Sequence, residues 1–139
     1  MRYDTAVEKL YNAFNSGELN AMDCKRCAVG NLCDNNDEWV DVIPCGNSLK
    51  HIEENYRKRP MEGLSKYPEY EKGLKVIEKT GYSPYELMMV EALFLDKTGH
   101  KSGETKEEQF NGLIAVIEYL ASLDDITIPQ ATIQKFAEV

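Results

Sequence analysis

The sequence lacks an apolar run long enough to cross a membrane, and it lacks an N-terminal signal. A spanning helix needs about 18 or more consecutive apolar residues. The two richest runs, 87–95 and 113–123, are interrupted by Glu91 and Glu118. The first eight residues are partly acidic, whereas a secretory signal requires an apolar segment there. We therefore expect a soluble cytoplasmic protein that does not contact a membrane.

Positive charge is also scarce. The chain of 139 residues has 16 Lys and Arg against 24 Asp and Glu, for a formal net charge of -8. Its one basic cluster, 57–59, follows two glutamates, which is typical of a solvated helix end. Nucleic-acid binding requires clustered Lys and Arg, so we expect no nucleic-acid partner. The acidic balance favours an unknown protein partner with a basic surface.

Residues that commonly carry catalysis are few. There are only 2 histidines, and no nucleophile elbow, phosphate-binding loop or zinc-protease motif is present. The segment 96–107 has the length of a calcium loop, but Thr98, His100 and Lys101 stand where that loop needs oxygen ligands and glycine. The sequence therefore favours binding or regulation over catalysis.

Two glutamates interrupt the most apolar segments. Glu91 and Glu118 could face one another as a buried carboxylate pair or hold a metal between helices. A single glutamate on a solvated helix face is the commoner arrangement. The sequence leaves their role open.

The apolar spacing predicts an all-α protein, a single compact domain over 1–139 with six or seven helices and an irregular cysteine-containing segment. No alternating strand pattern is visible apart from a short extended piece at 39–43. We expect helices near 4–15, 20–30, 48–59, 69–79, 84–97 and 106–122, and a last one from Pro129. In the 69–79 helix we expect Tyr70, Leu74 and Ile77 to face inward.

Two helix starts are especially clear. Ser83 and Glu86 form one capping-box pattern, with proline at the first helical position, and Thr105 and Glu108 form a second. The loop between these helices is short, which predicts an antiparallel helical pair over 84–122.

All four cysteines lie in the region 20–47, together with the only tryptophan, Trp39. Their spacing is C-x2-C, then x5 and x11 before the third and fourth. Four thiolates suit tetrahedral zinc or an iron–sulfur cluster, and a reducing compartment favours such sites over structural disulfides. Because acidic residues flank the site, we predict zinc, with iron–sulfur as the alternative. The predicted ligands are Cys24, Cys27, Cys33 and Cys45, with His51 as a possible substitute for one thiol.

Two other interpretations of the cysteines stay open. Cys24 and Cys27 could be a thiol redox couple, since Lys25 and Arg26 would favour a thiolate. A thioredoxin-type pair, however, follows a strand in a β-α-β context, and none is visible. Alternatively, the cysteines are small core residues of a cofactor-free protein-interaction module.

The run Cys24-x-x-Cys27-Ala28-Val29-Gly30-Asn31 resembles a small bacterial family of proteins of about this length, with weaker likeness at 82–87 and 110–113. Some members are labelled as a component of the Na+-translocating NADH-quinone reductase. That label would imply an iron–sulfur centre, flavin and nicotinamide sites and a membrane anchor. This chain has no C-x4-C-x2-C spacing and no G-x-G-x-x-G. The resemblance therefore implies only that Cys24, Cys27, Gly30 and Asn31 form a recurring motif.

Overall fold

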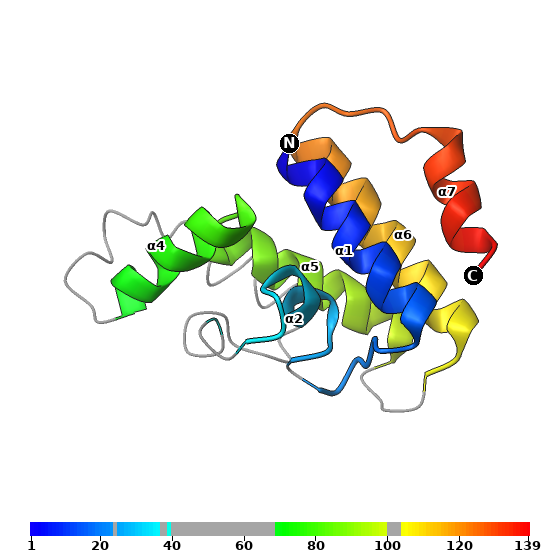
Figure 1. The fold of residues 1–139 in the computed structure, drawn as a ribbon, viewed down its shortest axis with the longest axis horizontal. Helices are drawn as coiled ribbons and strands as arrows, with labels where there is room; N and C mark the ends of the chain where they lie inside the picture. The colour runs from blue at the N-terminus through cyan, green and yellow to red at the C-terminus, as the bar shows by residue number, and fades with distance from the viewer. Residues whose placement is uncertain (24, 37–38, 40–68, 100–103) are drawn as a thin grey trace.

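The structure, a computed structural model, describes residues 1–23, 25–36, 39, 69–99 and 104–139, and for 69–72 the backbone alone. Within this part of the chain there are six helices and no strand, so the expected all-α class is confirmed (Figure 1). The helices are α1 (Arg2–Ser16), α2 (Ala28–Leu32), α4 (Glu69–Thr80), α5 (Pro84–Thr98), α6 (Lys106–Leu123) and α7 (Gln130–Ala137).

Helix α5 is the centre of the packing. Residues 87–92 are buried without interruption, which means that α5 is covered on all sides rather than along one stripe. Helices α2, α4 and α6 each contact it, and α1 packs on both α2 and α6. In Figure 1, α4 lies at the opposite end of the molecule from α7, while α1 and α6 run beside each other.

Both predicted capping boxes are present. The Ser83 hydroxyl accepts the Glu86 N–H at 3.2 Å, and the Glu86 carboxylate accepts the Ser83 N–H at 2.9 Å. The same reciprocal pair joins Thr105 and Glu108, at 3.1 and 3.0 Å. Each pair satisfies two backbone donors that the first helical turn would otherwise leave open. These contacts fix where α5 and α6 begin.

A glycine allows α5 and α6 to approach closely. A Cβ atom at Gly112 of α6 would lie 2.8 Å from Cδ1 of Phe94 and 3.2 Å from its backbone oxygen. Phe94 is fully buried, so its ring has no free space to move into. Gly112 therefore sets the distance between the two central helices.

The expected inward face of α4 is partly wrong. Leu74 is 43% exposed, whereas Val76 is 4% exposed and belongs to the core. Ile77 is half-buried, and the side chain of Tyr70 lies outside the described residues. The apolar spacing predicted the helix correctly. Because α4 lies at the edge of the molecule, however, the core buries only some of the apolar side chains that this spacing places on one face.

Several expectations fall outside the described residues. These are the helix at 48–59, the extended piece at 39–43 apart from Trp39, and the loop at 100–103. Trp39 itself lies in a turn and is fully buried. No helix in the described part of the chain is both long and apolar enough to cross a membrane.

Candidate metal centre

Two of the four predicted ligands belong to the described part of the chain, at opposite ends of α2. Cys27 immediately precedes the helix and Cys33 immediately follows it. Both residues are buried, each with 1% of its surface exposed. Cys24 and Cys45 lie outside the described residues, so the four-cysteine site stays a prediction.

Cys27 caps the start of α2 with its sulfur. Its backbone is extended, and its Sγ accepts the N–H of Gly30 at 3.3 Å. The sulfur thus takes the place of the serine, threonine or aspartate oxygen that usually caps a helix. A hydrogen bond donated to sulfur also favours its charged form, as do the hydrogen bonds that surround ligands in metal sites. The start of α2 therefore fixes the direction of the Cys27 sulfur.

Asn31 holds the backbone on both sides of this cap. Its side-chain amide donates to the carbonyl oxygens of Arg26 and Cys27, each at 3.0 Å. The Asn31 side-chain oxygen in turn accepts a hydrogen bond from the amide of Asn35 at 3.3 Å. Asn31 is 7% exposed, so these contacts are shielded from water. The motif residues Cys27, Gly30 and Asn31 are thus parts of one hydrogen-bonded unit.

The chain leaves α2 through an unusual turn. Asp34 and Asn35 both have positive φ angles, 57° and 60°, in the left-handed region that asparagine and aspartate tolerate better than other non-glycine residues. In this turn the side-chain amide of Asn35 donates a hydrogen bond to the carbonyl oxygen of Lys25. The backbone N–H of Asn35 donates to the carbonyl oxygen of Gly30. The two ends of the 25–35 segment are therefore fastened together.

The predicted helix over 20–30 is wrong. Residues 21–22 and 25–26 form turns, and the helix begins only at Ala28. The side-chain oxygens of Asn20 and Asp23 accept backbone N–H groups two residues further along, from Met22 and Lys25. Such local bonds compete with helical ones. Cys27 therefore lies at the start of α2, after a series of turns, instead of within a longer helix.

Cys33 is in a different environment from Cys27. Burial raises the pKa of its thiol to about 12, although the nearby ammonium groups of Lys79 and Lys9 act in the opposite direction. Lys9 pairs with Asp34 at 3.0 Å, and Lys79 lies 4.0 Å from the same carboxylate. At neutral pH Cys33 therefore carries a neutral thiol in the core.

The length of α2 separates the two described cysteines. Cys33 follows Cys27 by six positions, which corresponds to a rise of about 9 Å along the axis of a helix. Two sulfur ligands of one zinc ion lie within about 4 Å of each other, since each Zn–S bond is about 2.3 Å. The two cysteine side chains together can span most of that difference, so their positions at the two ends of the short helix α2 do not exclude Cys33 as a ligand.

No group of three or more His, Cys, Asp or Glu side chains that could hold a metal occurs among the residues that the structure describes. Any complete site must therefore use donors from the rest of the chain. The cysteines and histidines there are Cys24, Cys45, His51 and His100, and several acidic residues accompany them.

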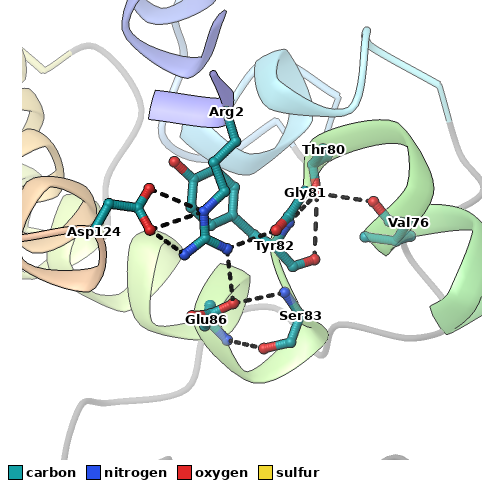
Figure 2. Close-up of polar contacts among 8 residues, drawn as sticks. All are labelled: Arg2, Val76, Thr80, Gly81, Tyr82, Ser83, Glu86 and Asp124. Carbon is teal, nitrogen blue, oxygen red and sulfur yellow. Dashed lines mark hydrogen bonds and ion pairs between the residues drawn. The ribbon is translucent and has the colours of Figure 1, made fainter. Parts of the chain in front are cut away.

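The structure also contains a polar cluster, centred on Arg2, that the sequence did not predict (Figure 2). The Arg2 guanidinium donates to both carboxylate oxygens of Asp124, at 2.6 to 3.2 Å, and to the carbonyl oxygen of Gly81 at 2.6 Å. It also lies 4.4 Å above the centre of the Tyr82 ring and 3.8 Å from the Glu86 carboxylate. Arg2 thus connects α1 to the start of α5 and the end of α6.

The Arg2 cluster is structural rather than reactive. Tyr82 is fully buried, and burial raises the pKa of its hydroxyl to about 12, so this group stays neutral. The Arg2 guanidinium is paired with the Asp124 carboxylate, so its charge serves to join elements of the fold. No local pattern could have revealed this cluster, since Arg2 and Asp124 are at opposite ends of the sequence.

The proposed carboxylate pair does not form. Glu91 is buried in α5 with 5% of its surface exposed, but Glu118 lies on an exposed face of α6. The expectation of a solvated helix face therefore holds for Glu118 and fails for Glu91.

Comparison with known proteins gives no independent support for any site. No family model, no curated protein and no solved structure matches this chain.

Proposed function

We propose that this protein is a non-enzymatic helical module that binds one zinc ion through its cysteine-containing loop. The ligands are Cys24, Cys27, Cys33 and Cys45, with His51 able to replace one thiol. The ion would tie the segment after α2 to the helical core.

The observation that supports this proposal is the environment of the Cys27 sulfur. It accepts a backbone N–H at 3.3 Å within a loop that Asn31 holds in place. Such hydrogen bonds orient metal ligands and stabilise their charge. The same bond gives the Gly30 N–H a partner in the first turn of α2 and fixes the direction in which the Cys27 sulfur points.

The burial of Cys27 also bears on the thiol-redox alternative. Thiol–disulfide exchange requires direct attack by an incoming sulfur, and therefore access. Cys27 is 1% exposed, which leaves no route for a second protein. A sulfur enclosed in this way suits a metal ligand better than an exchanging thiol.

The experiment is elemental analysis of protein purified without metal affinity, in reducing and oxygen-free buffer. We expect about one zinc per chain, consistent with a single tetrahedral site. Cys27→Ser should lose the zinc, although serine is itself a good helix cap and keeps α2 intact. Cys33→Ser should lose it as well, whereas Met22→Ser, at an exposed position shortly before the motif, is the control and should keep it. A chelator should lower the Tm of the wild type and leave that of Cys27→Ser unchanged.

Three results would contradict the proposal. Absence of metal in the wild type would leave the redox couple or the cofactor-free module. Iron together with sulfide would make electron transfer the leading function. Zinc retained in Cys27→Ser would show that the metal is bound elsewhere.

A further inference from the structure

Helix α7 is held to the body of the protein mainly by one side chain. Phe136 is the only buried residue of the helix and is 1% exposed. Its ring lies 5.4 Å from that of Tyr11, edge to face, and 6.2 Å from that of Phe14, stacked. We call the surface formed by Tyr11 and Phe14 on α1 the aromatic slot. Lys135 adds a cation over the Tyr11 ring at 3.9 Å.

Outside the helix itself, Ile126 and Ile128 before it and Val139 after it are only partly buried against the core. The helix begins at Pro129 without a side-chain cap, and an isolated helix of eight residues is not stable in water. Among the described residues, no hydrogen bond between α7 and α1 or α6 is present; the polar contacts of α7 are within the helix, such as Gln134 to Glu138. Segments with so few buried contacts open locally without unfolding the core. Helix α7 is therefore a part of the described fold that few buried side chains hold in place.

The connection between α6 and α7 contains a strained residue. Asp125 has φ 53°, and the N–H of Ile126 closes the turn on the carbonyl oxygen of Ala121 at 2.9 Å. This is the helix-ending turn in which the left-handed position is normally glycine. Aspartate adopts that conformation only at some energetic cost. Extension of the connection would release this strain.

We propose that α7 is a detachable arm, and that the aromatic slot is an interaction surface for α7 of a second copy of this chain. In such an exchanged dimer each Phe136 occupies the slot of the other copy, with the same contacts as in the monomer. The second copy is the partner because its α7 carries the aromatic and cationic residues that already fit the slot. Figure 1 shows α7 beside α1, joined to α6 by an extended connection.

The test compares Asp125→Val and Asp125→Gly with the wild type in the full chain. Valine makes the left-handed turn less favourable and glycine makes it more favourable, while both keep the backbone N–H. Light scattering after size exclusion, under reducing conditions and over a concentration series, measures the dimer fraction. We expect that fraction to be several-fold higher than wild type in the valine variant and lower than wild type in the glycine variant.

A second substitution identifies the surface. Phe136→Ala, added to Asp125→Val, should return the protein to a monomer, whereas Gln130→Ala on the exposed side of α7 should leave the dimer intact. A dimer that persists without Phe136 overturns the proposal, and so does a monomer in all variants at the highest concentration. If the valine variant fails to fold, the wild type and the glycine variant carry the test: a smaller dimer fraction with glycine supports the proposal, and no dimer in either overturns it.

Discussion

At the scale of single residues, the structure shows how the motif residues Cys27, Gly30 and Asn31 interact with one another and with the neighbouring backbone. Gly30 supplies the N–H that Cys27 accepts, and Asn31 holds the carbonyl groups of Arg26 and Cys27. The sequence showed that these residues stand together, but it could not show that they bond to each other. A side-chain amide can reach many backbone groups, and only the fold selects two of them.

The role of Asn31 can be measured by Asn31→Ala. The substitution removes three side-chain hydrogen bonds, each with a net contribution of about 0.5–1.5 kcal/mol, so the free energy of unfolding should fall by about 1.5–4.5 kcal/mol. The same change at Asn12, which is exposed on α1, is the control and should have little effect. Denaturant unfolding gives both values. Equal effects at the two positions would show that the Asn31 bonds do not stabilise the loop.

At the scale of elements, the helix starts were predictable and one helix was not. The capping boxes at Ser83 and Thr105 are local, because both partners lie within four residues of each other. Residues 20–27 also had a reasonable helical pattern. There the short polar side chains of Asn20 and Asp23 bind neighbouring backbone groups and stop helix formation before Ala28. Competing local bonds of similar strength make such segments hard to assign from sequence.

The packing of α5 against α6 yields a prediction for Gly112→Ala. Alanine favours a helix by about 1 kcal/mol over glycine, but its Cβ would lie 2.8 Å from the buried Phe94 ring. Overpacking of this kind costs about 1–3 kcal/mol, so we expect a net loss of stability of up to about 2 kcal/mol.

The control for that variant is Asn111→Ala, at the neighbouring exposed position of α6. It gains helix propensity without a clash and should be neutral or slightly stabilising. Thermal unfolding compares the two variants. A Gly112→Ala protein as stable as Asn111→Ala would mean that the Phe94 ring can move and that Gly112 does not set the helix distance.

At the scale of the whole molecule, the sequence predicted the fold class and most helices. It did not predict the long-range contacts that join the helices to one another. Helical spacing repeats within a few residues and can be read directly. The contact of Arg2 with Asp124 joins positions 122 residues apart, and no local pattern encodes it. For the candidate metal centre, the structure shows only how Cys27 and Cys33 are placed at the two ends of α2. The roles of Cys24, Cys45 and His51 stay predictions.

The Arg2–Asp124 pair should make stability depend on pH in a defined direction. The hydrogen bonds from Arg2 lower the pKa of the Asp124 carboxyl below its usual value. A carboxyl whose pKa is lower in the folded state adds stability above its unfolded pKa, near 3.9, and loses that contribution as the pH falls through the folded pKa. Asp124→Asn should therefore have a lower Tm than wild type at pH 7, and the difference should shrink below about pH 4.

The matched control is Asp125→Asn, which removes the same charge one residue away. Asp125 has no ion pair among the described residues, and asparagine tolerates its left-handed backbone. Its Tm should follow that of the wild type across the pH range. Similar pH profiles for the two variants would mean that net charge, and not the Arg2 contact, produces the effect. A Tm difference specific to Asp124 would show that this pair joins α1 to the end of α6, and therefore that these two helices, distant in the sequence, stabilise each other.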